Sequence, residues 1–66
     1  MQIMMNGEAM EVDDNFSINQ LVEKLELMNK RIAIELNCEI VPRSQFHAVR
    51  LKAGDCVEVV QAIGGG

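Results

Sequence analysis

The sequence contains no tryptophan, no tyrosine, one histidine and only two phenylalanines among its 66 residues. Because aromatic side chains are so scarce, the core must be built from aliphatic side chains, namely those of Ile, Val, Leu and Met. Hydrophobic residues make up 48% of the chain and charged residues 24%, a balance typical of a globular domain rather than a disordered chain. A chain this short forms one small domain with a marginal core.

A leader sequence and a long hydrophobic run are also missing. The first ten residues, MQIMMNGEAM, have neither the basic start nor the apolar stretch of a signal peptide. No segment approaches the roughly 20 apolar residues that cross a bilayer. We therefore expect a cytoplasmic protein that does not associate with membranes. Its two cysteines, Cys38 and Cys56, are then expected to be ordinary reduced thiols.

An excess of basic residues is absent as well. Six Lys and Arg against ten Asp and Glu give a formal net charge of −4, which argues against nucleic acid as a partner. Acidic residues dominate positions 1–29, whereas positions 30–66 hold five basic and four acidic residues. Arg43 and Arg50 belong to this second part, where they either complement the charge of a partner or form a solvated basic face.

The sequence shows no set of side chains with catalytic or metal-binding spacing. The positions of Cys38, His47 and Cys56 do not match a zinc motif, and nothing in the sequence marks either cysteine as an activated nucleophile. A glycine-rich loop that binds phosphate is missing too. We therefore predict that the protein is not an enzyme and binds no metal or cofactor of its own.

What the sequence does contain is a series of short structural signals. Asn6-Gly7 lies between alternating apolar residues and predicts a hairpin of strands at 2–5 and 8–12. Ser17, with Gln20 three residues later, predicts a capping box that begins a helix over residues 18–28. One apolar stripe follows helical spacing along that helix and consists of Ile18, Leu21, Val22, Leu25 and Met28.

Further strands are predicted at 32–37, 39–41 and 56–63. A turn at Asn37-Cys38 joins the first two, and a helical turn over 44–49, capped by Ser44, precedes the last. The first and last strands of the chain are the most apolar, so we expect them to lie at the centre of the sheet. A small mixed sheet covered by one helix belongs to the α+β class.

The chain ends in QAIGGG, which places three of its five glycines at its end. Such a run buries no side chain and loses much entropy when it is ordered. It is therefore either a tail without function or a slim segment that can enter a narrow binding site. We therefore divide the chain into a domain at 1–61 and a flexible tail at 62–66. Fully extended, the tail reaches roughly 17 Å.

Three segments, MQIMMNG, ELNCEIVPRSQF and LKAGDCVEVVQAIGGG, together with the order of the elements, resemble the ThiS family of sulfur carriers in thiamine biosynthesis. The resemblance implies the ubiquitin-like β-grasp fold, with parallel first and last strands. The family commonly has Asn-Gly at the turn where this chain has Asn37-Cys38. Cysteine lacks the freedom of glycine at positive φ, so we expect strain or a different turn there.

The resemblance implies that Gly66 is the reactive residue. A carboxylate is a poor electrophile until one of its oxygens becomes part of a leaving group. In the implied cycle, a ThiF-like enzyme adenylates the Gly66 carboxylate with ATP and Mg²⁺, and a persulfide donor converts it to a thiocarboxylate. A ThiG-like thiazole synthase then accepts the sulfur. The residues expected to contact these partners are Val60, Ala62, Ile63, Gly64 and Gly65.

Several alternatives stay open at this point. The carrier could serve molybdopterin synthesis or the thiolation of cysteine or tRNA, although the short length and the VPRSQ segment favour thiamine. The chain could also be a ubiquitin-like modifier joined to its targets through Gly66. Finally, it could be a β-grasp interaction domain whose tail has no function.

Overall fold

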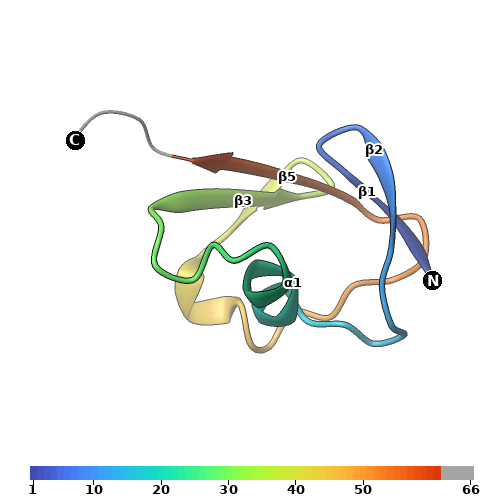
Figure 1. Cartoon of the computed structure of the whole chain (residues 1–66), viewed down its shortest axis with the longest axis horizontal. Helices are drawn as coiled ribbons and strands as arrows, with labels where there is room; N and C mark the ends of the chain where they lie inside the picture. The colour runs from blue at the N-terminus through green and yellow to red at the C-terminus, as the bar shows by residue number, and fades with distance from the viewer. Residues whose placement is uncertain (62–66) are drawn as a thin grey trace.

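The computed structural model describes residues 1–61, and the predictions that concern residues 62–66 lie outside this part of the chain. Its elements are, in chain order, β1 (Gln2–Met5), β2 (Glu8–Glu11), α1 (Ile18–Lys24), β3 (Ile32–Leu36), β4 (Glu39–Val41), the 3₁₀ helix η1 (Arg43–Gln45) and β5 (Cys56–Gln61). The five strands form one sheet in the order β2-β1-β5-β3-β4, and α1 lies against one face of it (Figure 1). The predicted α+β architecture is confirmed.

The first hairpin forms as the sequence predicts. β1 and β2 pair antiparallel, from Gln2 opposite Glu11 to Met5 opposite Glu8. Asn6 and Gly7 both have positive φ, 50° and 82°, which is the geometry that a two-residue hairpin turn requires. The hairpin therefore places β1 between β2 on one side and β5 on the other.

The first and last strands lie side by side in the interior of the sheet, as predicted. β1 pairs with β5 in parallel, with Met4 opposite Cys56 and Met5 opposite Val57. On its other edge β5 pairs antiparallel with β3, from Ile32 opposite Gln61 to Leu36 opposite Val57. Because β5 has neighbours on both edges, it is the strand that joins the two halves of the sheet.

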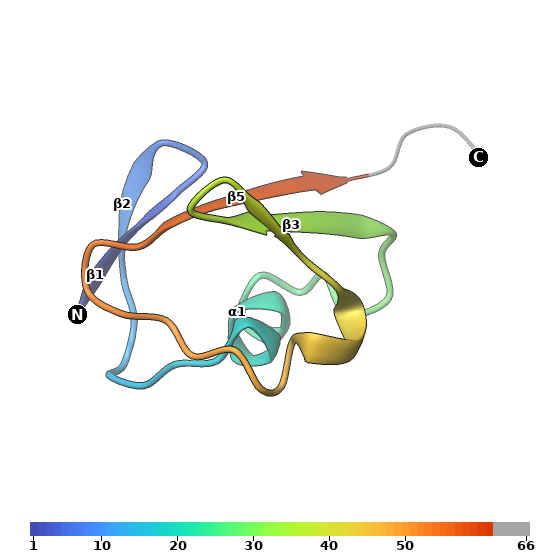
Figure 2. The ribbon, with the colours of Figure 1, turned by 180° about the vertical axis from the view of Figure 1, so that it is seen from behind.

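The hydrophobic core lies between the sheet and α1, which the front and rear views place on the same face (Figure 2). The fully buried side chains come from both layers and are Ile3, Ile18, Leu21, Val22, Ile34 and Val57. Phe46 and Leu51, which the sequence patterns did not assign to the core, are also buried. Both belong to the connection between β4 and β5, which closes the core along the side of the helix.

The start of α1 has the predicted capping box. The backbone N–H of Ser17 donates to Gln20 Oε1 at 2.8 Å, and the backbone N–H of Gln20 donates to Ser17 Oγ at 3.0 Å. These two bonds satisfy donors that a helix N-terminus would otherwise leave without partners. The helix therefore begins at Ile18, as expected.

The predicted end of this helix at residue 28 is wrong, because α1 ends at Lys24. Glu26 has a φ of 59°, and the N–H groups of Glu26 and Leu27 donate to the carbonyls of Glu23 and Val22. This is a Schellman motif, which reverses the chain after the last helical turn. Leu27 consequently packs against the core, while Met28, predicted to face it, is 44% exposed.

The helical turn predicted over 44–49 is shorter than expected and is not capped by Ser44. It is η1, Arg43–Gln45, with Pro42 at the N-cap position and no side-chain cap. Pro42 has a φ of −63°, which its ring fixes. The helical turn that follows begins at Arg43, one residue before the predicted start at Ser44. Ser44 therefore lies inside the turn instead of at its start.

The Asn37-Cys38 turn keeps a geometry that favours glycine at its second position. Asn37 and Cys38 have φ values of 50° and 73°, close to those of Asn6 and Gly7 in the first hairpin. A different turn type is therefore not formed. Cys38 instead adopts a conformation that is costly for a residue with a Cβ atom.

Replacing Cys38 by glycine removes this cost. We expect Cys38→Gly to raise the free energy of unfolding by about 0.5–1 kcal/mol, after allowing for the greater entropy of the unfolded glycine chain. Urea denaturation followed by circular dichroism measures the change. Cys38→Ala is the control, because alanine keeps the Cβ atom. Equal stabilities of the glycine and alanine variants would show that backbone strain at residue 38 is not the cause.

Candidate functional site

The site begins where β5 carries the chain toward residues 62–66. Val57 and Val59 face the core, and Val57 is only 1% exposed. Glu58 and Val60 alternate with them and lie on the opposite face. Val60 is 59% exposed, which confirms the sequence-based expectation that its side chain points away from the core. An apolar side chain is thus presented to solvent one residue before the end of β5.

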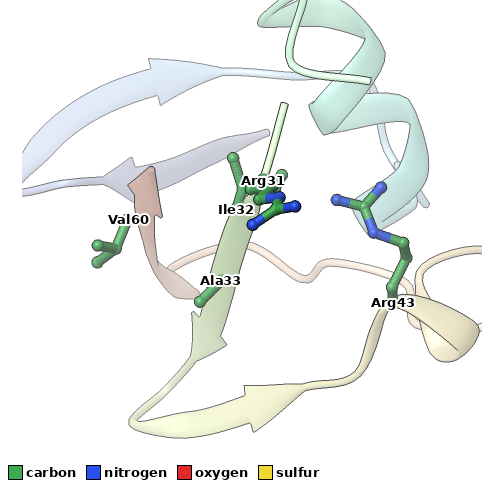
Figure 3. A pocket seen from close by; sticks show the side chains of 5 residues that line it. All are labelled: Arg31, Ile32, Ala33, Arg43 and Val60. Atoms are coloured by element: carbon green, nitrogen blue, oxygen red, sulfur yellow. The ribbon is translucent and has the colours of Figure 1, made fainter. Parts of the chain in front are cut away.

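Val60 belongs to a surface hollow of about 460 Å³, which we call the outer-face hollow. Its lining residues are Arg31, Ile32, Ala33, Arg43 and Val60 (Figure 3). Val60 lies opposite Ala33 in the pairing of β5 with β3, so these two residues supply adjacent apolar surface. The guanidinium groups of Arg31 and Arg43 face each other beyond β3. The hollow therefore combines an apolar part with a cationic rim.

Arg43 is held in place by two contacts within the domain. Its Nη2 donates to the carbonyl oxygen of Lys30 at 3.1 Å, and its Cζ lies 5.5 Å from the centroid of the Phe46 ring. A guanidinium above an aromatic face is attracted by the quadrupole of the ring. Arg43 therefore helps to anchor η1 to the chain before β3 while its head group borders the hollow.

The two arginines singled out in the sequence do not act together. Arg50 donates from Nη1 to the carbonyl of Asn15 at 3.4 Å and is not part of the hollow. Arg31, which the sequence patterns did not single out, does line it. Its signal is positional, since it directly precedes the strand that pairs with the end of β5.

A pair of carboxylates adjoins the apolar part of the outer face. Glu35 and Glu58 lie directly opposite each other in the pairing of β3 with β5, and opposed like charges destabilise a sheet slightly. Ile40, which is 73% exposed, lies opposite Glu35 on β4. On the outer face, the apolar part therefore lies between the carboxylates and the arginines of the hollow. A partner surface has to complement all three kinds of group.

Two asparagine side chains hydrogen-bond to the backbone of β5, and the sequence patterns indicated only their turns. The Val59 N–H donates to Asn6 Oδ1 at 2.8 Å, and Asn6 Nδ2 donates to the Val59 carbonyl at 3.3 Å. Near the other end of the strand, the Cys56 N–H donates to Asn37 Oδ1 at 3.0 Å. Each hairpin turn thereby extends the pairing of β5 by one position.

Within residues 1–61, no arrangement of side chains suggests catalysis. Cys38 and Cys56 are free and exposed, and His47 is exposed. No group of three or more His, Cys, Asp and Glu side chains in the described part is placed to hold a metal ion. No helix among these residues has both the length and the apolar character needed to cross a membrane.

The predicted site residues divide into two groups. Val60 lies in the described part, where it lines the outer-face hollow together with Ala33, Arg31 and Arg43. The remaining predicted residues lie outside the described part, and they are Ala62, Ile63, Gly64, Gly65 and Gly66. Their contacts with partners stay predictions.

A five-stranded mixed sheet packed on one helix, with parallel first and last strands, is the ubiquitin-like β-grasp fold. The family model described as the ThiS family matches residues 3–66. The sulfur carrier protein ThiS of Escherichia coli (strain K12) is 33% identical over 66 residues, a match that covers 100% of both proteins. The chain therefore belongs to the ThiS family, and its full-length relatives from Escherichia coli and Bacillus subtilis are named sulfur carrier protein ThiS.

A solved structure and a longer relative extend this comparison. The crystal structure of a thiamine biosynthesis protein (ThiS) from Geobacter metallireducens is similar, with a TM-score of 0.82 and 32% identity over 100% of both chains. A thiazole synthase of Paramagnetospirillum magneticum is 35% identical over 66 residues. The present chain spans only 20% of the length of that protein.

The opposite environments of two valines in β5 predict different costs for the same substitution. Val57→Ala should lower the free energy of unfolding by about 2 kcal/mol, because it empties a buried position. Val60→Ala should lower it by less than about 1 kcal/mol, because its side chain is largely exposed. Urea denaturation of the two variants compares them directly. A cost at Val60 equal to that at Val57 would mean that Val60 is not a surface residue.

Proposed function

We propose that this protein carries sulfur for thiazole formation in thiamine biosynthesis, as a thiocarboxylate at Gly66. The observation that carries the proposal is the match to the ThiS sulfur carriers over the whole chain, up to and including the terminal glycines. The reactive group is then the main-chain carboxylate of Gly66.

The proposed chemistry has two stages. In the first, a ThiF-like enzyme binds ATP and Mg²⁺, and a Gly66 carboxylate oxygen attacks the α-phosphorus, releasing pyrophosphate. In the second, a persulfide sulfur attacks the acyl carbon and displaces AMP. A thiol then cleaves the S–S bond, which forms a disulfide between this thiol and the donor sulfur and leaves the thiocarboxylate. Glycine suits both stages, because it has no Cβ atom to obstruct the approach to the carbonyl.

The folded domain supplies the recognition surface in this proposal. Val60 leads directly to the proposed reactive end and forms part of the outer-face hollow. An apolar centre with charged groups at its margin is the usual composition of a protein interface. We propose that Val60 contacts the adenylating enzyme and the thiazole synthase, while Ala62, Ile63, Gly64 and Gly65 enter their active sites.

The relatives favour a ThiG-like thiazole synthase as the acceptor. The matched segment of the Paramagnetospirillum magneticum protein lies in a chain named thiazole synthase, and two relatives of the same length are named ThiS. These names favour thiamine over molybdopterin synthesis, other thiolation pathways and protein modification. The proposed setting of all these reactions is the cytoplasm.

The direct test is the mass of the C-terminal peptide after incubation with ATP, Mg²⁺, a ThiF-like enzyme and a persulfide donor. Cleavage after Lys52 releases residues 53–66, which contain no methionine. This matters because oxidation of methionine adds nearly the same mass as replacement of oxygen by sulfur. We expect the peptide to gain the mass of this replacement. A Cys56→Ser variant removes the remaining oxidisable side chain, and an unchanged mass in that variant would contradict the proposal.

Blocking the Gly66 carboxylate provides a second test. One leucine added after Gly66 should abolish thiocarboxylate formation, because the acyl group that must be activated then lies in a peptide bond. The unfolding curve should not change, because the addition lies beyond the folded domain. A cleavable extension that restores Gly66 on removal is the matched control. Growth of a carrier-deficient strain without thiamine on the blocked protein would count against a role of this carboxylate.

A further inference from the structure

We propose that Asn6 is a positioning residue for the docking end of the carrier. Its side-chain amide bonds to the peptide groups on both sides of Val59, and so sets the direction in which β5 presents Val60. The step from this geometry to partner binding depends on the proposed function. The geometry itself depends only on contacts within the described domain.

Asn6 continues the pairing of β5 at the point where β1 ends. The backbone pairing of the two strands consists of Met4 opposite Cys56 and Met5 opposite Val57, and the Asn6 N–H donates to the Val57 carbonyl at 2.9 Å. The Asn6 side chain then accepts from the Val59 N–H at 2.8 Å and donates to the Val59 carbonyl at 3.3 Å. Its amide thus takes the place that a backbone peptide would occupy in a longer β1.

The bond from Asn6 Nδ2 to the Val59 carbonyl acts on the peptide group that Val59 shares with Val60, and the bond from the Val59 N–H acts on the preceding peptide group. The Val59 carbonyl faces Asn6 on one edge of β5, while Val60 pairs with Ala33 on the other edge. Without the amide of Asn6, the last residues of the described strand would be held by β3 alone. The strand could then twist about its pairing with β3, and the exposed Val60 side chain would lose its fixed direction.

Asparagine meets two requirements at position 6 that few residues meet together. The backbone has a φ of 50°, a conformation that asparagine tolerates better than most residues with a side chain. The bridge also needs one acceptor and one donor on the same planar group, which a side-chain amide supplies. Aspartate supplies only acceptors when ionised, and glycine supplies neither.

Asn37 provides a matched control within the same strand. It also has a φ of 50°, and its Oδ1 accepts from the Cys56 N–H at 3.0 Å. Its Nδ2 donates to Asp55 Oδ1 at 3.1 Å. Both asparagines therefore accept a bond from a backbone N–H of β5, Asn37 at Cys56 and Asn6 at Val59, and only Asn6 bonds next to Val60.

The test compares Asn6→Gly with Asn37→Gly, because glycine keeps the positive φ and removes only the side-chain bonds. Steady-state adenylation with a ThiF-like enzyme gives KM and kcat for the carrier, and amide hydrogen exchange reports the strand. We expect Asn6→Gly to raise KM about tenfold with kcat within about twofold of wild type, and to speed exchange at Val59. For Asn37→Gly we expect KM within about twofold of wild type, with faster exchange at Cys56.

Equal increases in KM for the two glycine variants would overturn the proposal, because they would reflect general destabilisation. An unchanged KM in Asn6→Gly would overturn it as well. If Asn6→Gly does not fold, Asn6→Asp serves in its place, since it keeps an acceptor for the Val59 N–H, and its KM should then lie above that of wild type. Failure of the wild-type protein to be adenylated would instead refute the proposed function, and the exchange rates at Val59 would still test the geometry.

Discussion

The structure depends on the pairing of β5 along both of its edges. β1 and β3 are far apart in sequence, and β5 joins them through a parallel pairing on one side and an antiparallel pairing on the other. The same strand buries Val57 in the hydrophobic core and leads toward the terminal glycines. A small domain has a marginal core. A shift of the strand that joins both halves of the sheet and contributes to this core would therefore disrupt the pairing and the packing of the whole domain. The proposed docking end is therefore attached to the most constrained element of the fold.

Local chemistry predicted the elements well, because their signals depend on neighbouring residues. The hairpin at Asn6-Gly7 and the capping box at Ser17 are of this kind, and both formed as predicted. The wrong predictions concern features that contacts outside the local pattern determine. The apolar stripe continues through Met28, but the Schellman motif at Glu26 ends α1 early. Phe46 is buried because the connection between β4 and β5 folds back onto the helix, which no periodicity in that segment indicates.

The candidate site was predicted only in outline, for the same physical reason. Strand alternation predicts the exposure of Val60, because Val57 and Val59 face the core and Val60 lies on the other face. The outer-face hollow cannot be read from alternation, because it joins residues from β3, η1 and β5. The register between β3 and β5 decides that Ala33, and not Glu35, lies beside Val60. Asn6 shows the same limit, since its turn is a local signal while its bond to Val59 joins residues 53 positions apart.

The proposed reactive group is the main-chain carboxylate of Gly66, so in this proposal the folded domain has no chemical role of its own. No side chain of the domain then needs an unusual charge state or a strained rotamer, so the core can be packed for stability alone. The demand on the domain is geometric: it must present one face and one strand end in a constant orientation. The Asn6 bridge meets this demand at the docking end, because it adds hydrogen bonds to β5 beyond the end of β1. β3 pairs with β5 as far as Gln61, whereas the pairing with β1 ends at Val57, and the bridge from Asn6 holds the edge of β5 beyond that point.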